Sequence, residues 1–111
     1  MLALCAFVPK PRSNHAFYQL EGLENLSHLD VLDLHSNRIS RMEGMATLTE
    51  LRVLNLAGNN IAVVEGLDSL LSLTELNLRR NIISTVKSIG HLTALCRLFL
   101  SSNQISTLES V

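Results

Sequence analysis

Apolar and polar positions recur along the chain with a constant period. Asn37, Asn59, Asn81 and Asn103 stand 22 positions apart, and a similar apolar frame surrounds each of them. The frame reads LxxLxLxxNxIxxLxxLxxL, with Met, Val or Ile in some of the later leucine places. Such self-similarity predicts stacked structural units, each of which buries its apolar side against the next unit.

The first part of the frame predicts a short strand. Leu32 and Leu34 alternate with Val31, Asp33 and His35, which is the period of a strand with one buried face. In stacked units the equivalent strands lie side by side as a parallel sheet. The expected core columns are Leu32, Leu54, Leu76 and Leu98, then Leu34, Leu56, Leu78 and Leu100, closed by Ile39, Ile61, Ile83 and Ile105.

The asparagine follows the strand, where the chain must turn. A turn leaves backbone N–H and C=O groups without partners in the sheet, and a carboxamide both donates and accepts hydrogen bonds. Aspartate lacks the donor, and leucine lacks both groups. We therefore predict a structural ladder formed by Asn37, Asn59, Asn81 and Asn103.

The period of the frame lies within the range of leucine-rich repeats. The segments 40–48, 62–70 and 84–92 carry apolar residues three positions apart, which favours 3₁₀-like turns over full helices. The fold class predicted is α/β: a leucine-rich-repeat solenoid forming a right-handed arc. Its short parallel strands line the concave face, and its 3₁₀-like turns line the convex face.

The predicted repeat domain covers residues 19–111, with a half repeat over 19–28 and repeats that begin near residues 29, 51, 73 and 95, the last incomplete. Residues 1–18 do not fit this register, because Lys10 and Arg12 occupy core leucine places and His15 occupies the asparagine place. We expect residues 1–18 to form a poorly ordered non-repeat segment. We also expect the exposed ends of the solenoid to self-associate, because no polar capping unit is recognisable.

Charge and cysteine content exclude several classes of function. Nine Lys and Arg residues against ten Asp and Glu residues give a net charge of −1, so the basic surface needed for nucleic acid or anionic lipid is missing. Cys5 and Cys96 lie far apart and outside any metal-binding spacing. Neither a signal peptide nor a membrane span is predicted at the amino terminus. We predict a cytoplasmic protein without metal or cofactor, and partial burial of Cys96 as a small apolar residue.

No motif of a catalytic site is present, and we predict that the chain is not an enzyme. Asp33, His35 and Ser36 are too close in sequence for the histidine to stand between the other two groups, as a triad requires. The outward side chains of the concave face remain as candidates for binding a protein partner. These are Asp33, His35, Asn55, Glu75, Asn77, Arg79, Arg97 and Phe99. Two interpretations of Phe99 stay open: an anchor for a partner, or a ring packed beneath the side chains of a further repeat.

The chain resembles a known class at the level of the repeat and beyond it. Its frame is similar to the 22-residue leucine-rich repeats of protein phosphatase 1 regulatory subunits and of axonemal and ciliary assembly proteins. The off-template runs VLDLH, LRVLNLA, LTELNLR and RLFLS resemble repeats of the non-catalytic leucine-rich repeat subunits of tubulin-modifying (polyglutamylase) complexes, over residues 20–111. This resemblance implies a scaffold near microtubules, centrioles or cilia, with the glutamate ligase chemistry on another subunit.

Two other functions stay open. A phosphatase-targeting or dynein-assembly regulator would have the same repeat class. An extracellular ligand-binding repeat protein would predict a cleaved amino terminus, a modified Asn25 in the run Asn25-Leu26-Ser27, and cysteine-rich caps.

Overall fold

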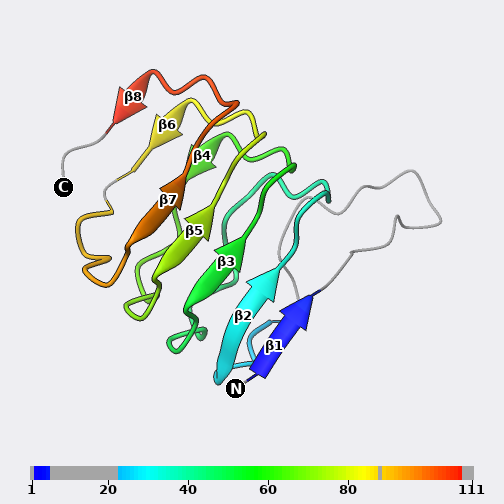
Figure 1. The fold of residues 1–111 in the computed structure, drawn as a ribbon, viewed down its shortest axis with the longest axis vertical. Coiled ribbons are helices and arrows are strands. Elements are labelled where there is room, and N and C mark those ends of the chain that lie inside the picture. Colours follow the sequence, from blue (N-terminus) through cyan, green and yellow to red (C-terminus); the bar gives the residue numbers. More distant parts are fainter. Residues whose placement is uncertain (1, 6–22, 88, 109–111) are drawn as a thin grey trace.

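The chain winds into successive coils that stack on one another (Figure 1). The computed structural model describes residues 2–5, 23–87 and 89–108. Strands on one side of the coils form a five-stranded sheet, and shorter strands on the opposite side form a three-stranded sheet. The parallel-strand solenoid that the sequence predicts is therefore confirmed.

The five-stranded sheet runs in the order β1-β2-β3-β5-β7, and all its strands are parallel. The strands are β1 (Leu2–Cys5), β2 (Leu29–Asp33), β3 (Val53–Asn55), β5 (Glu75–Asn77) and β7 (Arg97–Phe99). From β2 to β7 the residues that pair are 22 positions apart, as in Leu32 with Leu54 and Leu54 with Leu76. The sequence period and the register of the sheet therefore coincide.

Strand β1 is an element that the repeat register does not predict. Residues 2–5, within the segment expected to be non-repeat, pair with β2, where Leu4 lies beside Leu32. The paired residues of β1 and β2 are further apart in the sequence than one repeat period, so a search at constant spacing misses the strand. Parallel pairing requires only a matching strand, since the connection between two strands can vary in length. The rest of the predicted segment lies outside the described residues.

The opposite side of the coils also differs from its prediction. Strands β4 (Val63–Val64), β6 (Thr85–Val86) and β8 (Thr107–Leu108) form a second parallel sheet with the offset of the repeat, as in Val63 with Thr85. The 3₁₀-like turns follow these strands: after β4, Leu70 N–H donates to Leu67 C=O, and Leu73 N–H donates to Leu70 C=O, each at 3.1 Å. The residues that the structure describes contain no helix, so the α/β label is corrected to a β-solenoid with 3₁₀-like turns.

The core lies between the two sheets as columns of equivalent aliphatic side chains. Leu32, Leu54 and Leu76 have no exposed surface, and the next column and the isoleucines behind it are also buried up to Ile83. Burial of one such side chain stabilises the fold by about 2–3 kcal/mol. Leu98 departs from its column with 37% of its surface exposed, because β7 is the outermost strand of the described sheet.

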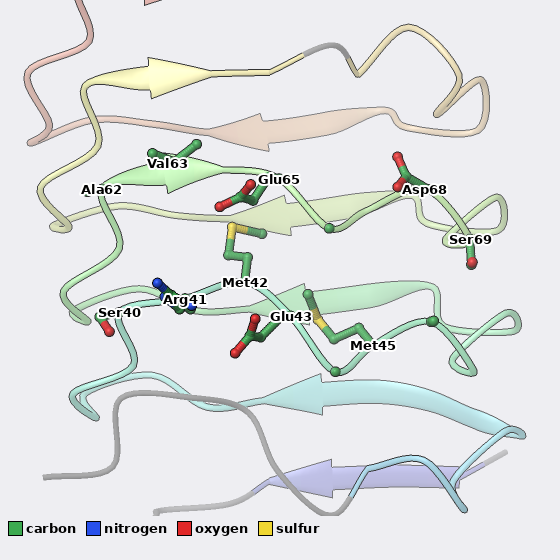
Figure 2. Close-up of a pocket in the computed structure, with 13 residues that line it drawn as sticks. Ser40, Arg41, Met42, Glu43, Met45, Ala62, Val63, Glu65, Asp68 and Ser69 are labelled. Carbon is green, nitrogen blue, oxygen red and sulfur yellow. The ribbon is translucent and has the colours of Figure 1, made fainter.

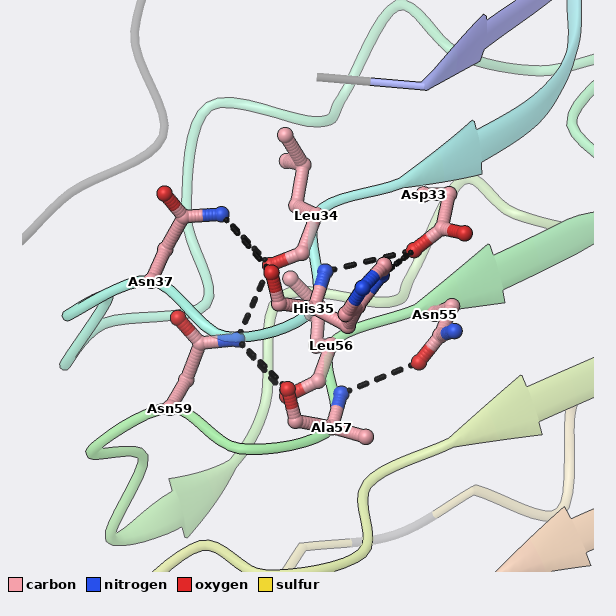
Figure 3. A network of polar contacts seen from close by, with 8 residues as sticks. All are labelled: Asp33, Leu34, His35, Asn37, Asn55, Leu56, Ala57 and Asn59. Atoms are coloured by element: carbon pink, nitrogen blue, oxygen red, sulfur yellow. Dashed lines mark hydrogen bonds and ion pairs between the residues drawn. The ribbon is translucent and has the colours of Figure 1, made fainter. Parts of the chain in front are cut away.

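The asparagines form a ladder that joins adjacent coils (Figure 3). Asn59 Nδ2 donates to Leu56 C=O of its own coil at 2.9 Å and to Leu34 C=O of the preceding coil at 3.1 Å. Its Oδ1 accepts from Ile39 N–H at 3.0 Å. Asn81 and Asn103 repeat this pattern one and two coils further along. The carboxamides therefore satisfy backbone groups of two coils at once.

The residue before each asparagine adopts a left-handed backbone conformation. The φ angles are 59° at Ser36, 70° at Gly58, 56° at Arg80 and 61° at Ser102. This conformation costs a non-glycine residue roughly 1–2 kcal/mol. The carboxamide bonds that follow hold the turn in place despite that cost.

Candidate protein-interaction face

The candidate site is the side of the five-stranded sheet that points away from the core. We use the term concave face for the outward side chains of β2, β3, β5 and β7, together with the residue two positions after each strand. The register places these side chains in rows across the sheet. The first row is Val31, Val53, Glu75 and Arg97, and the second is Asp33, Asn55, Asn77 and Phe99.

Three members of the second row have a structural role that the sequence analysis missed. Asn55 Oδ1 accepts from Ala57 N–H and Asn77 Oδ1 accepts from Arg79 N–H, each at 3.1 Å. Asp33 Oδ1 accepts from His35 N–H at 3.2 Å (Figure 3). These bonds close an Asx turn where the strand ends. An Asp or Asn two positions before the bonded N–H is the sequence signal that could have revealed this role.

Phe99 takes the fourth place in that row, so the run of turn-closing side chains stops at β7. The guanidinium of Arg79, on the preceding coil, lies over the Phe99 ring with 4.2 Å between Cζ and the ring centroid. A cation at this distance is attracted by the negative face of the ring. Phe99 and Arg79 therefore form a paired apolar and cationic surface on the concave face.

Glu75 and Arg97 lie next to this pair. Arg97 Nη1 is 3.5 Å from Glu75 Oε1, and the side chains are 72% and 33% exposed. An exposed ion pair contributes about 0–1 kcal/mol and exchanges partners readily. The structure thus brings together four of the predicted residues: Glu75, Arg79, Arg97 and Phe99.

His35 belongs to the other end of the face, on the β2 coil. Its Nδ1 lies 2.7 Å from Asp33 Oδ1, and its side chain is 60% exposed. Asp33 therefore fixes the orientation of the imidazole through the same oxygen that closes the turn. This pair lies two strands from β5 in the sheet order, so the predicted residues divide into two groups.

Ion pairs between equivalent positions of adjacent coils add to the link made by the asparagines. Arg52 donates from Nε to Asp30 Oδ1 and from Nη2 to Asp30 Oδ2, the latter at 2.7 Å. His28 pairs with Glu50 and Lys87 pairs with Glu65 across the same interval of one repeat. The hydrogen bonds from Arg52 lower the pKa of Asp30 below its ordinary value.

This pKa shift predicts a pH-dependent contribution to stability. A carboxylate with a lowered pKa in the folded state stabilises the fold above its unfolded-state pKa, and that contribution is lost as the pH falls through the folded-state pKa. Arg52→Gln should therefore lower the melting temperature at pH 7, and the difference from the wild type should shrink below about pH 4. Thermal unfolding followed by circular dichroism at both pH values measures this. Arg38→Gln, at another exposed arginine, is the control; an equal pH dependence in both variants would contradict the assignment.

A pocket of about 810 Å³ lies on the other side of the solenoid, beside β4 (Figure 2). Met42 and Met45 are buried beneath it, and Glu43, Glu65 and Asp68 are exposed at its edge. Across residues 2–5, 23–87 and 89–108, no group of three His, Cys, Asp or Glu side chains is placed to hold a metal ion. The pocket is separate from Phe99 and shares no residue with the concave face.

The environment of Cys96 differs from the prediction made from sequence. Cys96 is exposed, so the expected partial burial is wrong; its Sγ contacts the carbonyl of Ala94 at 3.3 Å. In the part of the chain that the structure covers, no helix is long and apolar enough to cross a membrane.

Comparisons with known proteins identify the repeat. A family described as "Leucine rich repeat" matches residues 13–61, and one described as "Leucine Rich repeats (2 copies)" matches residues 49–92. The first match begins before residue 19, where the sequence analysis placed the start of the repeat domain. A search of curated proteins found no match.

A solved structure supports the same fold. The crystal structure of an internalin (inlF) from Listeria monocytogenes is 30% identical in sequence, with a TM-score of 0.64. The similarity covers 80% of this chain and 30% of the internalin, so the chain spans less than a third of that protein's length. Solenoids of this type are typically non-catalytic binding scaffolds, and their repeats generally mediate protein–protein interaction. The family matches, the carboxamide ladder and the internalin-like coil together identify the chain as a leucine-rich repeat protein.

Proposed function

We propose that the chain is a protein–protein interaction scaffold that binds a partner with its concave face around Phe99. The observation that carries this proposal is the Phe99 ring on the outward side of β7, with the Arg79 guanidinium stacked on it at 4.2 Å. Aromatic and arginine side chains are the residues that most often dominate binding energy at protein interfaces. A short parallel sheet with fixed register holds both groups in place without a partner, which reduces the entropic cost of binding.

We further propose that the scaffold is a non-catalytic subunit of a tubulin-modifying (polyglutamylase) complex or of a related ciliary or cytoskeletal assembly. Support comes from the off-template runs, which resemble those of leucine-rich repeat-containing protein 49, a subunit of that complex. In this proposal the chain works in the cytoplasm, at the cytoskeleton, the centriole or the cilium. A phosphatase-targeting or dynein-assembly regulator is the alternative within the same repeat class.

Affinity capture with the tagged chain from ciliated cells, followed by mass spectrometry, tests the identity of the partner. Recovery of tubulin ligase subunits supports the proposed complex. Recovery of phosphatase catalytic subunits or dynein-assembly factors in their place would favour the alternative and contradict the proposed complex.

Phe99→Ala tests the binding face itself. We expect this substitution to weaken the captured interaction by roughly tenfold or more, because truncation of a central aromatic anchor costs about 2 kcal/mol. Val53→Ala, in another row of the same face, is the matched control and should change the affinity less than threefold. Titration of the purified partner by isothermal calorimetry measures both. Equal affinities for the wild type and Phe99→Ala would place the binding surface elsewhere.

A further inference from the structure

Charge is distributed unevenly along the concave face and its edge. On the β5 and β7 coils, the side chains of Arg79, Arg80 and Arg97 are positively charged, and that of Glu75 is negatively charged. On the β2 and β3 coils, Asp30 and Asp33 stand against Arg52, and Arg52 is held by both carboxylate oxygens of Asp30. The end of the face that carries Phe99 is therefore basic, although the whole chain has a net charge of −1.

The arginines at the basic end retain donors for a partner. The Arg79 guanidinium lies over the Phe99 ring, with 4.2 Å between Cζ and the ring centroid, and a guanidinium carries five N–H donors. Arg97 is 72% exposed and meets Glu75 at 3.5 Å, which is long for a charge-assisted hydrogen bond. Planar guanidinium donors match carboxylate oxygens two at a time.

An exposed apolar side chain lies close in sequence to these charges. Ile82 is 61% exposed in the loop after Asn81, at a position where the other repeats carry Arg38, Asn60 and Gln104. Sequence reasoning missed Ile82, although its departure from a polar position was visible in the repeat. Phe99 offers an apolar contact beside the Arg79 guanidinium, on the strand that also carries Arg97, which fits a segment that combines acidic and apolar residues.

We propose that the basic end of the concave face binds an acidic segment of a protein partner. The carboxylates of the segment pair with Arg79, Arg80 and Arg97, and one apolar side chain packs on the exposed surface of Phe99. This inference rests on the proposed function and specifies the chemistry of the partner.

Two short peptides test the charge requirement. Fluorescein-labelled EELEE and its neutral counterpart QQLQQ are titrated with the full chain, and fluorescence anisotropy reports binding. At low salt we expect EELEE to bind at least tenfold more tightly than QQLQQ, with the preference falling as salt screens the charges. Equal affinity for the two peptides would overturn the proposal.

Substitutions locate the site. The double variant Arg79→Gln and Arg97→Gln should weaken EELEE binding about fivefold to twentyfold, since each lost exposed charge pair changes the affinity a few-fold. Arg41→Gln, on the pocket side of the solenoid, is the matched control and should leave binding unchanged. The double variant with lysine retains the charge and should retain most of the binding, which separates charge from loss of the fold. Unchanged binding by the glutamine variant would overturn the proposal.

Two outcomes separate this inference from other possibilities. If EELEE fails to bind but Phe99→Ala still disrupts the captured interaction, the acidic preference is wrong and the proposed interaction face stands. If light scattering finds a salt-sensitive dimer that the glutamine variant abolishes, and neither peptide binds, the occupant is the acidic end of a second copy and the proposal is overturned.

Discussion

Replacement of Asn59 by alanine is expected to lower the free energy of unfolding by about 3–5 kcal/mol. The buried Ile39 N–H is left without a partner, which costs about 1–3 kcal/mol, and each hydrogen bond lost to a carbonyl costs about 0.5–1.5 kcal/mol more. The carboxamide donates to the carbonyls of Leu34, Leu56 and Ala57 and accepts from Ile39 N–H. Asn59 is only 5% exposed, so water cannot replace these bonds. Urea unfolding followed by circular dichroism measures the loss, as a lower midpoint or an absent transition.

The neighbouring residue provides the control for this prediction. Asn60 is exposed, so Asn60→Ala should change the free energy of unfolding by less than about 0.5 kcal/mol.

The substitution Asn59→Asp keeps the acceptor for Ile39 N–H but replaces the donor with a carboxylate oxygen that faces carbonyls. Burial raises the pKa of such a carboxyl, so the stability of this variant should rise as the pH falls from 7 to about 4. Equal stability of the Asn59→Ala and Asn60→Ala variants would refute the structural role of the ladder.

Gly66→Ala is the second substitution with a large expected effect. A Cβ built on Gly66 would lie 2.0 Å from the carbonyl oxygen of Met42, which is backbone of the preceding coil. The φ angle of +72° adds the usual cost of a left-handed conformation, roughly 1–2 kcal/mol. Relief of the overlap requires the two coils to separate, at a further cost of about 1–3 kcal/mol. We expect a total loss of roughly 2–5 kcal/mol in the free energy of unfolding.

Gly58→Ala separates the cost of the left-handed conformation from the cost of the overlap with Met42. The φ angle of +70° at Gly58 is nearly the same, but the nearest atoms to a Cβ there belong to Ser36 at 3.4 Å. Gly58→Ala should therefore show only the conformational cost of about 1–2 kcal/mol. Thermal and urea unfolding of the two variants, measured side by side, give the difference. If Gly58→Ala is as destabilising as Gly66→Ala, the overlap with the Met42 carbonyl does not contribute to the loss of stability in Gly66→Ala.

The repeat was predictable because each of its positions obeys a local rule. Leu32 and Leu34 alternate as a strand requires, and Asn37 stands where the turn needs both a donor and an acceptor. Because the coils have equal length, equivalent residues of successive repeats become neighbours in space. The rows of the concave face, such as Asn77 beside Phe99, follow directly from this spacing.

Strand β1 was not predictable from a constant period, because its offset from β2 is longer than one repeat, with Leu4 beside Leu32. The second sheet was also missed, because two-residue strands such as Val63–Val64 carry too short a pattern to distinguish from a turn. Both features depend on backbone pairing between coils, which the hydrophobic pattern of one coil does not specify.

The candidate face shows the same division. That Phe99 and Arg79 point outward follows from their places in the repeat, and the sequence analysis placed both on the concave face. The stacking of the Arg79 guanidinium on the ring, and the use of Asn55 and Asn77 to close turns, depend on side-chain positions that only the folded chain defines.

By itself, the sequence determined the repeating coil, its aliphatic columns, its asparagine positions and the identity of the residues that share a row. Only the tertiary structure decided how the coils meet: the added strand at the amino-terminal edge, the second sheet, and the contacts at the basic end of the concave face around Phe99. The physical reason is that periodic burial is encoded by every coil separately. Contacts across coils arise from distances between groups whose positions are set when the coils stack.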